Sequence, residues 1–141
     1  MNWSKILSNK NIQICQEYCK RIVKELLEEY SNQGIALEHY KEVLDELEGS
    51  KIRFKNIVML YTRWTGEIAI PTHVVINEWT NEIMSGHYKF HQPKLNYEKY
   101  AGEVKSHFRN VIKEYIELEK EIKEKQIMKR LEDLERDFEN E

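Results

Sequence analysis

The apolar residues of the first part of the chain recur at intervals of three and four. From Asn11 to Tyr30 they form one stripe, made of Ile12, Cys15, Cys19, Ile22, Leu26 and Tyr30 and widened by Val23 and Leu27. This period is that of one face of an α-helix. The pattern predicts a helix over these residues, ended by Gly34, since glycine readily adopts the left-handed conformation of a helix C-cap.

Three further segments carry apolar residues at the same intervals: Ala36–Glu48, Lys51–Thr65 and Thr72–Ser85. Their spacing predicts three more helices, with glycines 49, 66 and 86 after their ends. Four aromatic residues on these stripes and on the last one are predicted to lie in the core: Tyr61, Trp64, Trp79 and Phe108. The stretch from Gly86 to Lys94 lacks this period and is predicted to be an irregular loop.

The last element is predicted to begin at Asn96 as N-cap and to run toward the end of the chain. Its apolar residues alternate steps of four and three: Tyr97, Ala101, Val104, Phe108, Val111, Tyr115, Leu118 and Ile122. Lys125 breaks this heptad seam, and a second stripe follows at Ile127, Leu131, Leu134 and Phe138. The offset between the stripes predicts a hinge, or a change of partner face, at residues 123–126.

These elements predict an all-α fold, a four- to five-helix bundle of antiparallel hairpins with a long charged C-terminal helix. The chain has only five glycines and two prolines among 141 residues, too few for the frequent turns of an all-β fold. One domain is expected at this length. The predicted boundaries are 1–122 for a helical core and 123–141 for a charged helical extension.

Charge is distributed unevenly, although the net charge is only −3. Residues 51–110 contain nine Lys and Arg against five Asp and Glu, together with nine of the fifteen aromatic residues. From Lys113 onward eleven acidic residues face seven basic ones. Lysines neutralise phosphates and flat rings stack on bases, so the middle of the chain is a candidate surface for nucleic acid or another acidic partner.

The residues predicted to contact such a partner are Lys51, Arg53, Lys55, His87, Tyr88, Lys89, Phe90, His91, Lys94 and Arg109. A second predicted surface is the stripe Ile127, Leu131, Leu134 and Phe138. It has too few apolar residues to close a core but enough to form a seam with a protein partner or a second copy.

Catalytic patterns are scarce. The chain has no phosphate-binding glycine loop, no Ser-His-Asp order and no CxxC pair. His87 and His91 are four residues apart and are weighed as a metal pair, but Gly86 and Pro93 make a helix around them doubtful. Cys15 and Cys19 lack companion ligands and are expected to be buried thiols of a reducing compartment. No enzyme activity, metal or cofactor is predicted.

The stretch from Ile70 to Asn77 (IPTHVVIN), the stretch from Lys94 to Tyr100 (KLNYEKY) and the triplet Ser106-His107-Phe108 carry a resemblance. They resemble the C-terminal helical module of Firmicute and phage helicase-loader and primosome proteins of the DnaD/DnaB type. The residues from His87 to Gln92 interrupt that module's spacing, and its glycine-threonine step is absent. The resemblance implies a proline-led helix, a tyrosine-bearing helix and a role in replication.

The functional prediction is a non-enzymatic protein-interaction or adaptor module of a bacterial or phage system, with replication as the candidate process. Its partner is expected to be a protein or a second copy bound through the C-terminal helix. Two alternatives stay open: a small nucleic-acid-binding protein that uses the basic, aromatic middle, and a small metal-dependent enzyme. No signal peptide or membrane-spanning run is visible, which predicts a cytoplasmic location without membrane contact.

Overall fold

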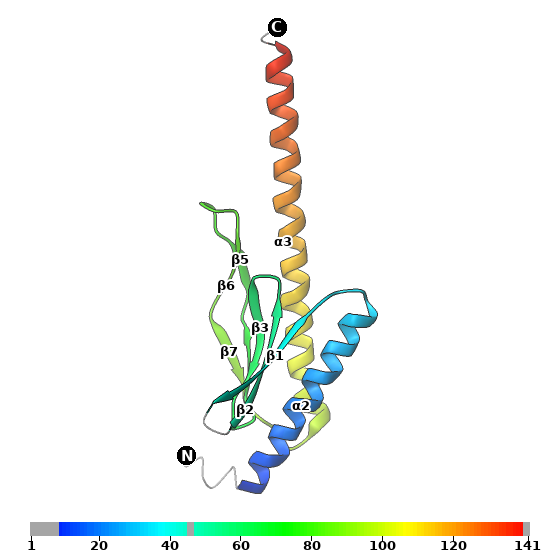
Figure 1. Ribbon diagram of the computed structural model, residues 1–141, viewed down its shortest axis with the longest axis vertical. Coiled ribbons are helices and arrows are strands. Elements are labelled where there is room, and N and C mark those ends of the chain that lie inside the picture. Colours follow the sequence, from blue (N-terminus) through cyan, green and yellow to red (C-terminus); the bar gives the residue numbers. More distant parts are fainter. Residues whose placement is uncertain (1–8, 45–46, 140–141) are drawn as a thin grey trace.

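The computed structural model describes residues 9–44 and 47–139, and these form a mixed α/β fold (Figure 1). In chain order the elements are α2 (Asn9–Asn32), β1 (Glu38–Leu44), β2 (Leu47–Phe54), β3 (Ile57–Thr62), β4 (Ile68–Pro71), β5 (Val74–Ile76), β6 (Ile83–Ser85), β7 (Tyr88–His91) and α3 (Tyr97–Glu139). The predicted all-α bundle is therefore wrong. Only its first and last helices occur in the described chain, and strands replace the others.

The sheet is an antiparallel meander of five strands in the order β1-β2-β3-β4-β7. Strands β5 and β6 continue the β4–β7 hairpin beyond the sheet as a two-stranded ribbon, because both pairs keep the same register, Ile68↔His91 and Ile76↔Ile83. Figure 1 shows this ribbon extending beside α3. The segment Gly86–Lys94, predicted to be a loop, thus contains an edge strand.

The helical spacing of residues 51–65 has a local cause. Ile52 and Phe54 are buried on either side of exposed Arg53, which is the period of a strand. In β3, Met59 and Leu60 are both fully buried because the register shifts there by one residue, as in a β-bulge. Such a bulge puts residues three apart on one side and so imitates the period of a helix.

Two of the four aromatic residues predicted to be core are on the surface. Trp79 lies in the β5–β6 turn and is 96% exposed, and Trp64 lies in the β3–β4 turn and is 52% exposed. Tyr61 is half-buried on the sheet, and Phe108 is buried as predicted. The prediction failed for the two tryptophans because it assumed the period of a helix. Residues spaced by that period do not share a face when a turn between strands separates them.

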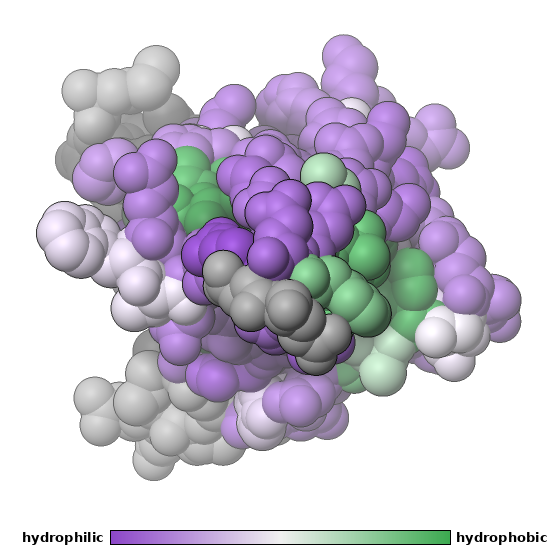
Figure 2. Space-filling view, turned by 90° about the horizontal axis from the view of Figure 1, so that it is seen from above, coloured by the Kyte–Doolittle hydropathy of each residue, from purple (hydrophilic) through white to green (hydrophobic). Residues whose placement is uncertain are grey.

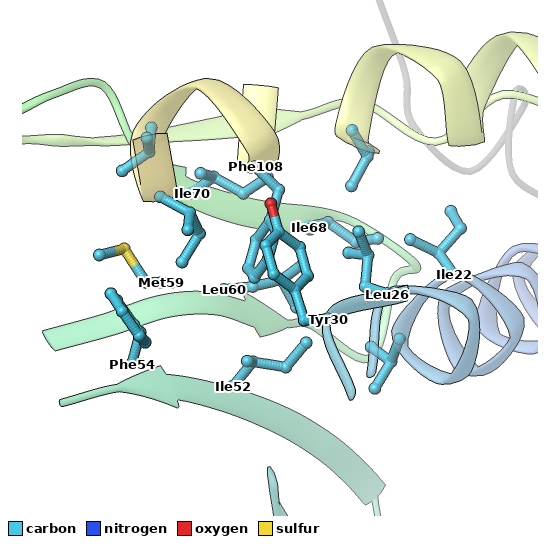
Figure 3. Close-up of a cluster of buried hydrophobic side chains, with 14 of the residues drawn as sticks. Ile22, Leu26, Tyr30, Ile52, Phe54, Met59, Leu60, Ile68, Ile70 and Phe108 are labelled. Atoms are coloured by element: carbon cyan, nitrogen blue, oxygen red, sulfur yellow. The ribbon is translucent and has the colours of Figure 1, made fainter. Parts of the chain in front are cut away.

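Both helices pack on the same side of the sheet, and the core lies between (Figures 1 and 3). In Figure 3, Tyr30 and Phe108 meet edge to face above the side chains of the strands, with their ring centroids 5.5 Å apart. Helix α2 buries its predicted stripe and ends in a Schellman motif, in which the Ile35 N–H donates to the Tyr30 carbonyl and Gly34 has φ of 75°.

Helix α3 begins as predicted, since the Asn96 side chain accepts a hydrogen bond from the Lys99 N–H (3.1 Å). Its predicted seam from Tyr97 to Ile122 packs on the core, with the middle of the seam fully buried. Charged pairs fix it to α2: Glu25 pairs with Lys105, and Arg109 donates to Glu29 (2.6 and 3.0 Å). The helix continues without interruption through residues 123–126, so the offset between its stripes changes the face and does not break the helix.

Candidate functional site

The ten predicted contact residues do not form one patch. Four of them share the side of the sheet that faces away from the helices: Lys51, Arg53, Tyr88 and Phe90. Three cations are held by carboxylates elsewhere, in the pairs Lys55–Glu119, Lys94–Glu103 and Arg109–Glu29. His91 and Lys89 belong to the helix side of β7, and His87 is exposed at its start.

The side of the sheet opposite the helices is here called the outer face. Residues directly opposite each other in neighbouring strands share a side, and the register gives one row across all five strands: Tyr40, Lys51, Tyr61, Ala69 and Phe90. A second row pairs Glu38, Arg53 and Val58. The rows bring together residues of β1 and β7 that are about fifty positions apart in the sequence.

The centre of the outer face is an aromatic cluster of Tyr61, Tyr88 and Phe90. The ring centroid of Tyr61 lies 5.4 Å from that of Tyr88 and 5.9 Å from that of Phe90. The rings cover Ala69, which is fully buried although its register places it on this face. The Tyr88 hydroxyl donates to the Val58 carbonyl (2.8 Å), which fixes its ring.

Cations surround this cluster. The guanidinium of Arg63 lies 4.1 Å above the ring of Phe90, a cation–π contact. Lys51 lies opposite Tyr61 in the register, and the exposed Arg53 is the next residue of β2 on the same face. Sequence reasoning missed Tyr61 and Arg63 as surface residues. The alternation Tyr61, Thr62, Arg63 beside Tyr88, Lys89, Phe90 would have revealed them, had these segments been interpreted as strands.

The end of α3 is a second uncovered surface. Every residue from 123 to 139 is exposed, including Met128 (58% exposed) and a stripe of four apolar side chains: Ile127 (57%), Leu131 (52%), Leu134 (55%) and Phe138 (75%). Figure 1 shows this part of the helix projecting beyond the sheet, and Figure 2, seen from that end, shows hydrophobic residues uncovered to one side of it. These four residues are called the tail seam below.

The tail seam does not continue the buried seam. Ile122 and Ile127 are five residues apart, which is a rotation of about 140° around a helix axis. The tail seam therefore faces nearly away from the side on which α3 packs against its own domain. A helix lying along it would not meet the sheet.

Two histidines on the helix side of the sheet, the buried His91 and the partly buried His107, form a pair. The Nε2 atom of His91 lies 2.7 Å from Nδ1 of His107. The pKa of His107 is raised by a hydrogen bond with the Pro71 backbone but lowered more by burial. Burial, together with the charge on His107 and Lys89, lowers the pKa of His91 to about 4. Both rings are therefore neutral near pH 7, and one donates to the other.

Chemistry beyond hydrogen bonding has little support at these residues. Across the described ranges, His, Cys, Asp and Glu form no group of three or more that could hold a metal ion, and His91 meets His107 rather than His87. Burial raises the pKa of the Cys19 thiol to about 12 and also raises that of Cys15. Neither thiol has the lowered pKa of a reactive cysteine.

A groove of about 680 Å³ lies between α2 and the β1–β2 hairpin. Among the described residues, Cys19, Val23 and Leu27 supply its apolar lining, and the polar lining includes Lys20, Lys24, Glu28, His39, Lys41 and Arg63.

Comparison of the chain with protein-family models, with curated proteins and with solved structures found no match. The fold contradicts one element that the helicase-loader resemblance implies, the proline-led helix, whereas the tyrosine-bearing segment from Tyr97 does begin a helix. The proline-led segment Ile70–Asn77 forms the end of β4 and strand β5, not a helix. Neither of the two described helices has the length and hydrophobicity to span a bilayer.

Proposed function

We propose that the protein is a non-enzymatic interaction module that associates with a second copy of itself through the tail seam. The observation that carries this proposal is the exposure of all four seam side chains by more than half. Soluble proteins seldom leave large apolar side chains aligned along an uncovered helix unless something binds there. The raised pKa values of the two thiols and the neutral histidine pair support a role without catalysis.

The seam has the geometry of a helix–helix contact. Its steps of four, three and four residues are those of alternating core positions in a coiled coil. A helix of this length without tertiary contacts is marginal in water, since burial of an apolar face supplies most helix stability. A partner helix along the seam would supply that burial.

A second copy suits the charges beside the seam. Arg130 and Asp137 flank it on one side and Glu135 on the other. When two copies run antiparallel, Arg130 of each lies near Asp137 of the other, an attractive pair. Glu124 and Lys120 precede Ile127 on the same face of the helix. The antiparallel direction keeps each of them away from the same residue of the second copy. The four-residue seam is short, so we expect a dimer with a dissociation constant on the order of micromolar.

Sedimentation of the full chain over protein concentrations from about 1 to about 200 μM tests this proposal. The mass is expected to rise from monomer to dimer, and the double variant Leu131→Gln, Leu134→Gln is expected to stay monomeric. Glutamine has nearly the helix propensity of leucine, so the change removes the apolar contact rather than the helix. The matched control Lys129→Gln, Glu132→Gln lies on the opposite side of the helix and keeps the net charge.

Two outcomes would contradict the proposal. The wild-type chain would remain a monomer at the highest concentration, or the leucine double variant would dimerise as the control does. Direction can be measured separately with spin labels at Glu139→Cys, which lie far apart in an antiparallel pair and close together in a parallel one.

A further inference from the structure

We propose that the outer face of the sheet binds single-stranded nucleic acid. This site is separate from the tail seam, because the outer face is the side of the sheet opposite α3. The free face of an antiparallel sheet normally carries polar side chains that face water. Here it carries the three rings of the aromatic cluster, with a fourth, Tyr40, 47% exposed on β1.

The rings are arranged as a platform for flat ligands. Tyr61 is inclined by 56° to Tyr88 and by 82° to Phe90, so none of these rings is stacked face to face on its neighbour. Ala69 beneath them and the hydrogen bond from Tyr88 to Val58 restrict their movement. Bases stack on such rings irrespective of sequence, and a fixed ring loses little entropy when a base binds.

The outer face carries both cations and carboxylates, and the cations border the rings. Lys51, Arg53 and Arg63 belong to this face. Two described carboxylates also belong to it: Glu38 accepts a hydrogen bond from the Tyr40 hydroxyl, and Glu67, opposite Arg63, accepts hydrogen bonds from the Thr65 hydroxyl (2.8 Å) and the Gln92 amide (3.3 Å). Among the described side chains, residues 9–41 and 49–139, no carboxylate forms an ion pair with Arg53 or Arg63, whereas Lys55, Lys94 and Arg109 are each paired. Cations next to stacking rings match the alternation of phosphates and bases.

The arrangement favours a single strand over a duplex. The row from Tyr40 to Phe90 crosses four strand intervals, about 19 Å, on a twisted sheet surface. A duplex hides the faces of its bases, so rings on such a surface cannot stack on them. With Arg53 and Arg63 on phosphates, the logarithm of the affinity is expected to fall with that of the salt concentration with a slope of about −1.4 or steeper.

The test measures fluorescence anisotropy of a labelled twelve-nucleotide oligothymidylate against a twelve-unit abasic oligomer with the same number of phosphates. We expect the thymidylate to bind at low salt at least tenfold more tightly than the abasic strand, since only the former has bases to stack. An acidic peptide site would not distinguish the two strands. Equal binding of both strands, or no binding of either, would overturn the proposal.

Variants locate the site. Tyr61→Leu and Phe90→Leu keep an apolar cover over Ala69 but remove the stacking surface, and each is expected to weaken binding about tenfold. The double reversal Lys51→Glu, Arg53→Glu is expected to weaken binding at least tenfold and to flatten the salt dependence. Its matched control is Lys113→Glu, Lys120→Glu, two exposed lysines of α3, with no such loss. If the control loses as much affinity as the outer-face reversal, or both leucine variants bind like the wild type, the site is not the outer face.

Discussion

The two halves of α3 have the same kind of sequence and opposite surroundings. From Tyr97 to Ile122, apolar residues at steps of four and three are buried against α2 and the sheet. From Ile127 to Phe138, residues at the same steps are exposed by more than half. The period therefore predicts a helix in both halves, but the partner of each stripe is decided by tertiary structure. Only the first half finds its partner within the described chain.

The largest contrast is expected from truncating one apolar residue in each half. Phe108→Ala should lower the free energy of unfolding by about 3–5 kcal/mol, because it opens a cavity beside Tyr30. Leu131→Ala should change it by less than about 0.5 kcal/mol at concentrations where the chain is monomeric. Denaturation in urea at low protein concentration measures both. Comparable losses would mean that the tail packs on its own domain.

Acid should weaken the anchored half through the histidine pair. The unfolded chain takes up a proton at His91 near pH 6.5, whereas the folded protein does so only near pH 4. In the folded protein, burial and the positive charges of His107, Lys89 and Lys94 oppose protonation of His91. The nearby Glu103 favours protonation, but by less. The unfolded state thus binds more protons between these values. The free energy of unfolding should fall by about 2–3 kcal/mol as the pH drops from 6.5 to 4.

Urea denaturation at a series of pH values measures this loss, and His91→Asn should flatten the curve above pH 4.5. The hydrogen bond from Lys105 helps to lower the pKa of Glu25 to about 2. The stability that Glu25 contributes is therefore lost only below pH 4.5. An equally steep curve between pH 6.5 and 4.5 in the asparagine variant would assign the effect to other groups.

A small effect is also expected at Arg109, which the sequence analysis predicted to be a ligand contact. Its guanidinium is half-exposed and holds Glu29 of α2, so Arg109→Gln should cost no more than about 1 kcal/mol of stability. The same oligothymidylate assay should show unchanged binding in this variant. Weakened binding would extend the nucleic-acid site from the sheet to α3.

What the sequence could predict depended on which elements are helices. The stripe of α2, its glycine cap, the Asn96 cap and the seam of α3 are local features, and the structure confirms them. The strands were missed because the bulge at Met59 and the turns at Trp64 and Trp79 imitate helical intervals. Lys51, Arg53, Tyr88 and Phe90 were identified by composition alone. Their common face with Tyr61 and Arg63 depends on strand pairing across the sheet, which no local pattern shows.

Because α3 is continuous from the domain to the tail, it fixes the angle around its axis between the sheet and a partner bound at the tail seam. Forty-three residues give a rod of about 65 Å. Inserting one residue near Gln126 would rotate the tail seam around the helix axis by about 100°. Inserting seven would rotate it by only about 20° while lengthening the helix. Insertions or deletions near Gln126 should thus preserve this angle only when they comprise whole heptads.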